Sequence, residues 1–138
     1  MLIPDVNVLV AAFRSDHEHH DVARSWLQSA VAGIEPVGLT ESVLAAVVRI
    51  VTNPRIFRTP TPAVEIFDEL DRLRAVAHLI RPGRTWWSVF RGLCAESSAR
   101  GPLVSDAAHA ATAIEAGATW VTFDRDFARF PGLRWQTP

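Results

Sequence analysis

Short apolar runs alternate with segments of helical periodicity along most of this chain. The apolar runs predict buried strands, at residues 1–4, 35–39, 76–80, 119–123 and 133–135. The segments between them repeat apolar residues at helical spacing and predict helices, at residues 18–32, 41–52, 62–75, 84–98 and 106–116. Strands that alternate with helices pair in parallel, with helices on both faces of the sheet and right-handed crossovers. The pattern therefore predicts an α/β fold.

The length and composition predict one domain. A chain of 138 residues, 49% hydrophobic and 21% charged, is of ordinary size and composition for a single globular domain with its own core. We expect that domain to span residues 1–138. No apolar run reaches the roughly 18–20 residues that a membrane span needs. Asp5 and Asn7 interrupt the first apolar stretch, so we expect no signal peptide, and the single Cys94 leads us to expect a reducing cytoplasm.

The charges restrict the chemistry. The net charge is −1, so any binding to nucleic acid must use local basic patches rather than a global field. All 14 basic residues are arginine. Without lysine the chain cannot form a Schiff base, and it cannot carry the phosphate-binding lysine of a P-loop.

Four acids occupy positions that a parallel sheet would bring together. Asp5, Glu41 and Asp124 each follow a predicted strand, and Asp106 opens a predicted helix. Polar groups at the carboxyl ends of parallel strands line the ligand crevice of such folds. The four acids are therefore expected at one edge of one sheet, although each also has a simpler interpretation as a surface acid or a helix cap.

The last of these helices carries signals at both ends. Ser105 is the predicted N-cap, directly before Asp106. Gly117 is the predicted residue just beyond the last turn, where a left-handed conformation is common.

A cluster of carboxylates suits a hard divalent cation. Neighbouring carboxylates repel one another and raise each other's pKa unless a cation neutralises them. Oxygen ligands favour Mg²⁺ or Mn²⁺, and no cysteine or histidine set has the spacing of a zinc site. Such a site suits phosphodiester hydrolysis, because the ion lowers the pKa of a bound water and holds the scissile phosphate.

Several segments together resemble one known family. These are "IPDVNVLVAAF", "HEHHDVARSWL", "LTESVLAAVVRIVTNPRIF" and "VSDAAHAATAIEAGATWVTFDRDFARFPGLRW". They resemble the PIN-domain family, and within it the VapC-type toxins of bacterial toxin–antitoxin pairs. The resemblance implies a three-layer α/β/α sandwich with a five-stranded, mainly parallel sheet. It also implies a Mg²⁺-dependent endoribonuclease that inhibits translation and growth, a homodimer, and a cognate VapB-type antitoxin that covers the site.

The resemblance assigns roles to individual residues. Asp5, Asp106 and Asp124 match the family's metal-binding acids, and Asn7 matches the small polar residue after the first of them. Thr122 matches a hydroxyl that holds the site together.

Two further acids match the family less closely. Asp126 matches a frequent second acid, which either reaches the metal through water or caps the next turn. The family's usual glutamate on the second predicted helix is replaced here by Ala45, and Glu41 stands one turn earlier. Because residues four apart share a helix face, Glu41 is predicted to take over that catalytic role.

Arginines near these motifs are candidate contacts for RNA phosphates. Arg49 and Arg55 lie in "RIVTNPRIF", and Arg125 lies between two acids. Arginine suits bidentate phosphate contacts, while solvated surface arginine is the alternative interpretation. His109 lies three residues after Asp106, either facing the site or packed on an alanine-rich helix.

Two rival functions remain open at this point. A phosphatase of the haloacid-dehalogenase type also carries an aspartate after its first strand. It needs a second aspartate where this chain has Asn7, and it needs a lysine. The other rival is a catalytically degenerate PIN-like binding module. The three aspartates argue against it, and the displaced Glu41 keeps it open.

Overall fold

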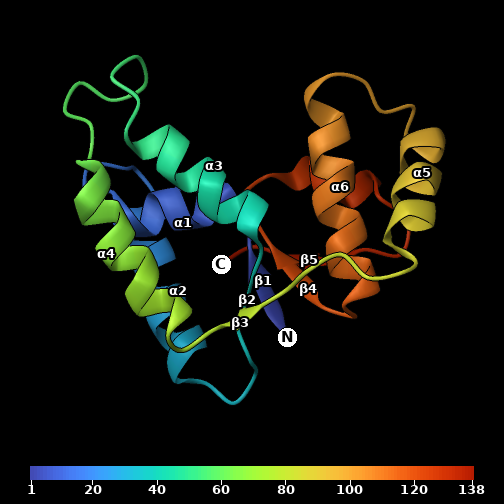
Figure 1. Cartoon of the computed structure of the whole chain (residues 1–138), viewed down its shortest axis with the longest axis horizontal. Helices are drawn as coiled ribbons and strands as arrows, with labels where there is room; N and C mark the ends of the chain where they lie inside the picture. Colours follow the sequence, from blue (N-terminus) through green and yellow to red (C-terminus); the bar gives the residue numbers. More distant parts are fainter.

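The computed structural model describes residues 1–138 and has an α/β architecture (Figure 1). All five predicted strands are present, as β1 Leu2–Pro4, β2 Gly38–Leu39, β3 His78–Leu79, β4 Thr119–Val121 and β5 Arg134–Gln136. The helices are α1 Val6–Phe13, α2 His20–Ala32, α3 Glu41–Val51, α4 Ala63–Arg74, α5 Trp86–Glu96 and α6 Pro102–Glu115, with a short 3₁₀ helix, η1, at Arg125–Arg129.

Every strand pairs in parallel, but the strands form two separate sheets. One sheet has the order β1-β4-β5, and β2 pairs with β3 in a second, two-stranded sheet. A single bridge between Leu2 and Val37 joins them, with the Leu2 N–H donating to Pro36 O at 2.9 Å. The predicted continuous five-stranded sheet is thus interrupted between β1 and β2. The next residue of β1 that faces β2 is Pro4, which has no N–H to donate to Gly38, and this prevents a longer ladder there.

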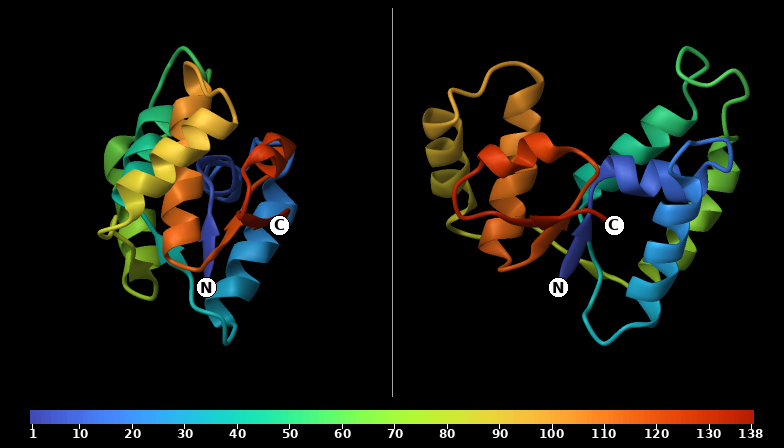
Figure 2. Two further views of the ribbon diagram at one scale, coloured as in Figure 1. Left: turned by 90° about the vertical axis from the view of Figure 1, so that its right-hand side faces the viewer. Right: turned by 180° about the vertical axis from the view of Figure 1, so that it is seen from behind.

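Helices cover the strands from two sides (Figures 1 and 2). The first four helices, α1 to α4, lie on one side, where α1 contacts both α2 and α3. Helices α5 and α6 pack on each other on the opposite side, and α6 contacts β4. The α/β layering predicted from the sequence is therefore confirmed. No helix in the structure is both long enough and apolar enough to span a membrane.

Helix α1 was not predicted from the sequence. Its residues Val8, Leu9, Val10, Ala11 and Ala12 are all buried, so the segment is apolar on every side and shows no helical period. The Asp5 carboxylate accepts a hydrogen bond from the Val6 N–H and caps its N-terminus. The chain therefore turns directly from β1 into a buried helix.

The predicted start of α6 was wrong, and its predicted end is confirmed. The helix begins at Pro102, a favoured first position, after Gly101 with φ 54°. Ser105 is therefore not the N-cap, and Asp106 lies in the second turn rather than at the helix end. Gly117 follows the last turn with φ 60°, a left-handed conformation.

Two glycines provide a matched test of this backbone. A Cβ at Gly117 would meet no atom within 4 Å, so Gly117→Ala should cost about 1–2 kcal/mol through its left-handed conformation alone. Gly92 lies inside α5 with equally open surroundings, so Gly92→Ala should add up to about 1 kcal/mol. Urea unfolding of the two variants measures both changes. Shifts of the same sign in both would contradict the assigned conformations.

Candidate active site

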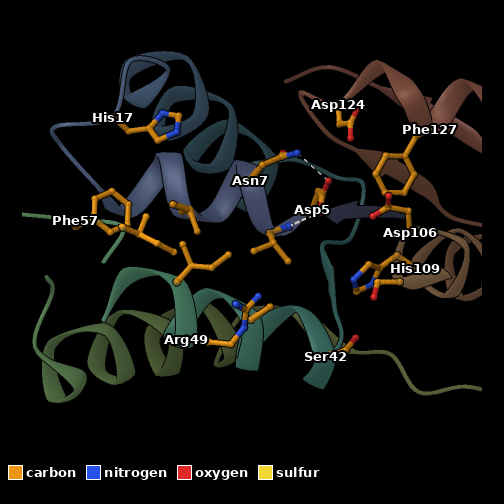
Figure 3. A pocket seen from close by; sticks show the side chains of 16 residues that line it. Asp5, Asn7, His17, Ser42, Arg49, Phe57, Asp106, His109, Asp124 and Phe127 are labelled. Carbon is orange, nitrogen blue, oxygen red and sulfur yellow. Dashed lines mark hydrogen bonds between the residues drawn. The ribbon is translucent and has the colours of Figure 1, made fainter. Parts of the chain in front are cut away.

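The carboxyl ends of β1 and β4 meet at one edge of the sheet. Pro4 is paired with Val121, and the Asp5 N–H donates to Val121 O at 2.8 Å. Asp5 directly follows β1, and Thr122 directly follows β4. Asp5 lines a cavity of about 710 Å³, a volume typical of small-molecule sites, and the fully buried Thr122 lies behind it (Figure 3).

Asp5 is buried and almost saturated with hydrogen bonds. Its Oδ1 accepts from the Val6 N–H at 2.6 Å. Its Oδ2 accepts from Asn7 Nδ2 at 2.9 Å and from Thr122 Oγ1 at 2.6 Å. A carboxylate offers about four lone-pair positions, so one position on Oδ1 remains for a ligand. These contacts, two from neighbouring residues and one from the distant Thr122, fix both the place of this carboxylate and the direction in which it can bind.

Thr122 connects the residues of this edge. It donates to Asp5, and its Oγ1 accepts from Asn7 Nδ2 and from the Asp124 N–H, both at 3.0 Å. Asn7 Oδ1 in turn accepts from the Phe123 N–H at 3.2 Å. The structure therefore brings together four residues that the sequence predicted for the site, from two segments more than a hundred residues apart.

Asp106 reaches the same cavity from α6. Its side chain is half-buried, and no hydrogen bond to the carboxylate shifts its pKa. Burial raises its pKa above the ordinary aspartate value, and the charges of Asp5 and Asp124 raise it further. The pKa of Asp5 is also raised, chiefly by burial, against the opposing effect of its hydrogen bond from Thr122. The three carboxylates thus repel one another across the cavity.

The two acids of "TFDRDF" lie in different places. Asp124 lines the cavity, and its Oδ1 accepts from the Asp126 N–H at 2.8 Å, which caps η1. Asp126 does not line the cavity; it is exposed, with a distant ion pair of 3.8 Å to Arg129. Asp124 therefore serves both as a cap and as a wall of the cavity.

The structure does not bring Glu41 to this cavity. Glu41 is exposed and accepts from Arg81 Nε at 3.1 Å; its own backbone N–H and then Arg81 lower its pKa. Glu41 and Ala45 share a helix face, as predicted, but that face lines a different groove between α3 and α4. The α3 residues that line the acidic cavity include Ser42, Ala46 and Arg49. One residue along a helix rotates a side chain by about 100°, which separates the two faces.

Other residues of the cavity carried no strong sequence signal. His17, Ile56, Phe57 and Phe127 line it, and all four come from loops or from η1. Their positions depend on how loops pack, which periodicity does not report.

Of the four histidine and arginine residues predicted near the site, two line the cavity and two do not. His109 lines the cavity and stacks on Trp120, with ring centroids 5.3 Å apart. Burial lowers its pKa, against the opposing charge of Asp106. Arg49 also lines the cavity, whereas Arg55 and Arg125 are exposed outside it.

The donors of the cavity suit a hard cation. Asp5, Asp106 and Asp124 offer only oxygen, the ligand that Mg²⁺ and Mn²⁺ prefer. No three acidic, histidine or cysteine side chains in the structure are close enough together to hold an ion by themselves. The arrangement therefore fits an ion such as Mg²⁺, which is bound by one or two carboxylates and keeps several waters.

Comparison with known proteins agrees with this geometry. Residues 2–133 match the PIN domain family. Ribonuclease VapC43 of Mycobacterium tuberculosis is 44% identical over 140 residues, which cover 100% of this chain and 95% of that protein. The VapBC2 complex of Rickettsia felis, bound to a promoter DNA fragment, contains a chain of the same fold. It has a TM-score of 0.75 and 20% identity, and the match covers 99% of this chain and 98% of that one.

The chain therefore belongs to the PIN-domain family. Within that family it groups with the VapC ribonucleases, as its 44% identity to VapC43 over its whole length shows. The same relationship disfavours both the phosphatase and the binding module as alternatives.

The raised pKa values predict how the metal-free protein responds to pH. A carboxyl with a raised pKa binds its proton more tightly in the folded state, so folding stability falls as pH rises from about 4 through the folded-state pKa. Asp106→Asn removes one repelling charge and should raise the melting temperature in EDTA at neutral pH. That gain should shrink below pH 4, where wild-type Asp106 is protonated.

Thermal unfolding across this pH range, with Asp126→Asn as an exposed control, measures the effect. A lower melting temperature for Asp106→Asn at neutral pH would contradict the repulsion among the three acids.

The two faces of α3 make a second test. Ala46 lines the acidic cavity, and Ala45 lines the other groove. Ala46→Glu adds a fourth carboxylate to the cavity and should tighten Mn²⁺ binding. We expect a change of about tenfold, which is a modest part of the binding free energy that a charged ligand contributes. Ala45→Glu is the matched control and should leave Mn²⁺ affinity unchanged. Calorimetry with Mn²⁺ distinguishes them, and tighter binding by Ala45→Glu instead would show that the faces are misassigned.

Proposed function

We propose that this protein is a Mg²⁺-dependent endoribonuclease toxin that cleaves RNA and thereby inhibits translation and growth. The observation that supports this most strongly is the convergence of Asp5, Asp106 and Asp124 on one cavity, with Asp5 fixed by Thr122. The names of its relatives support the ribonuclease class. Mn²⁺ should substitute for Mg²⁺, because it accepts the same oxygen ligands.

Each side chain has a distinct task in this proposal. Asp5 presents one free position of Oδ1, because Thr122 and Asn7 occupy its other oxygen. Asp106 and Asp124, which line the same cavity, supply the remaining charge. A divalent ion bound by one or two of these carboxylates would supply an activated water and would neutralise charge on the scissile phosphate. Asp126 acts only through its backbone N–H, which fixes Asp124.

The partners follow from the same site. An uncompensated carboxylate cluster is a strong local field on a nearly neutral chain, so a VapB-type antitoxin should cover it with a basic side chain. The structural similarity to a chain of a VapBC complex supports this partner. We also propose a homodimer. Trp87 on α5 is 66% exposed, while Trp86 is held by its Nε1 donating to Thr112 Oγ1 at 2.9 Å, so Trp87 is free for such a contact.

RNA phosphates are expected to contact arginines near the cavity. Arg49 lies in the cavity wall. Arg55 and Arg125 belong to the same sequence motifs and are exposed. Arg49 is the strongest of these candidates because it alone lines the cavity.

Substitution of the acids tests the proposal. Asp5→Asn and Asp106→Asn should each reduce cleavage of RNA by at least about 100-fold, since even residues that only support a metal ligand cost 10–100-fold. Both variants should remain folded by circular dichroism. Asp126→Asn is the matched control and should cleave at close to the wild-type rate. Cleavage should also cease in EDTA and return with Mg²⁺ or Mn²⁺. Near-wild-type cleavage by Asp106→Asn, or full activity in EDTA, would refute the proposal.

A further inference from the structure

The cavity continues well beyond the acids. Beyond the acids it is also lined by His17, Arg49, Ile56 and Phe57, which we call the distal subsite. Figure 3 shows Arg49 between the acids and Phe57. Ser42 and Arg49 both line the cavity from α3, and seven residues of helix span about 10 Å. Successive nucleotides of one strand in a duplex rise by only about 3.4 Å. The cavity is therefore long enough to hold more of a nucleic acid strand than the phosphate at the acids.

Arg49 is a cation without a partner in the chain. Its guanidinium points into the cavity (Figure 3), and it forms none of the ion pairs that hold other arginines, such as those of Arg72 with Glu69 and Arg74 with Asp71. The cavity is thus lined by charges of opposite sign, the acids and Arg49. A free guanidinium at this place is suited to a phosphate, which it binds through paired N–H groups.

Phe57 is held at the wall by Arg14. Arg14 is buried and forms a two-pronged ion pair with Asp16, at 2.9 and 2.6 Å. Its Nη1 also donates to Thr59 O at 2.8 Å and to Thr61 Oγ1 at 2.9 Å. The centre of the guanidinium lies 4.1 Å from the centroid of the Phe57 ring. The loop after α3 is thus tied to the end of α1, which fixes an aromatic ring beside the cavity.

His17 adds an oriented donor. Its Nδ1 accepts a hydrogen bond from the His19 N–H at 3.1 Å. In the neutral ring the proton therefore resides on Nε2, which this contact leaves free to donate. Ile56, which is 52% exposed, adds an apolar surface beside the two rings.

A phosphate-binding cation, a fixed aromatic ring and a free donor are the elements that recognise a nucleotide. Aromatic side chains stack on bases, and arginine binds the backbone of a single strand. A peptide would need acidic groups for Arg49 and basic groups for the aspartates a short distance away. A nucleic acid strand needs only its own phosphates, one at the cation held by the acids and the next at Arg49.

We infer that the distal subsite binds the nucleotide next to the cleaved bond, with its phosphate on Arg49 and its base against Phe57. This inference rests on the proposed ribonuclease function and adds the position of the substrate strand. Arg14 is the positioning residue that holds Phe57 in place.

Binding of a short single-stranded oligoribonucleotide of mixed sequence tests the inference. The affinity is measured at several salt concentrations with Asp106→Asn as the background, so that the RNA stays intact. Arg49→Gln should weaken binding and reduce the slope of log affinity against log salt by about 0.7, the value for one phosphate contact on a single strand. Arg84→Gln removes the same charge from an exposed loop before α5 and should leave the slope unchanged.

Phe57 is tested with two variants. Phe57→Leu keeps an apolar side chain and should weaken binding about tenfold through lost stacking, with the salt slope unchanged. Phe57→Tyr keeps the ring and should bind like the parent, which separates loss of stacking from loss of fold. Phe67→Leu, on the exposed face of α4, is the matched control.

The outcomes are distinguishable. Equal salt slopes for Arg49→Gln and Arg84→Gln, or wild-type binding by folded Phe57→Leu, would overturn the inference. So would weaker binding of an antitoxin peptide by Arg49→Gln without any change in RNA binding, because the subsite would then belong to the protein partner. If the wild-type protein fails to cleave RNA while Arg49 and Phe57 still determine its binding, the proposed function fails and the subsite stands.

Discussion

The hydrogen bond from Thr122 Oγ1 to Asp5 Oδ2, 2.6 Å long and buried, is the contact on which the site depends. It joins the ends of the first and fourth strands of the chain. Through it, Thr122 donates to one oxygen of a carboxylate whose ionisation burial makes unfavourable. The same hydroxyl accepts from Asn7 and from the Asp124 N–H, so one threonine fixes the acids that follow both strands. A buried polar group is tolerable only when it is satisfied in this way.

Capping and function coincide at this edge. Asp5 caps α1 and Asp124 caps η1, which is the ordinary structural use of an aspartate at those positions. Each cap engages only part of a carboxylate: Asp5 keeps one free position on Oδ1, and no hydrogen bond engages Oδ2 of Asp124. The interpretation of these acids as caps is therefore confirmed, and it is compatible with the functional one that we propose. Asp106 differs, because it has no cap to form in the second turn of α6.

The cavity is electrically asymmetric. The charge of Asp124 raises the pKa of Asp5, the charges of Asp5 and Asp124 raise that of Asp106, and an unpaired arginine lines the same cavity beyond these acids. A nucleic acid strand would match both charges. One of its phosphates would lie on a divalent ion held by the carboxylates, and the next would lie on the arginine. Arg14 contributes from outside the cavity by holding the loop that carries Phe57.

The sequence alone determined the layering, the parallel strands and the acids that follow β1 and β4, because hydrophobic period and strand-end position are local properties. It did not reveal α1, whose residues are buried on every side and lack a period. It also placed Glu41 and Ala45 correctly on one face of α3 but could not tell which cavity that face lines. That choice, like the positions of His17 and Phe57, was decided by tertiary structure, because a helix's rotation and a loop's path are set by contacts between residues far apart in the chain.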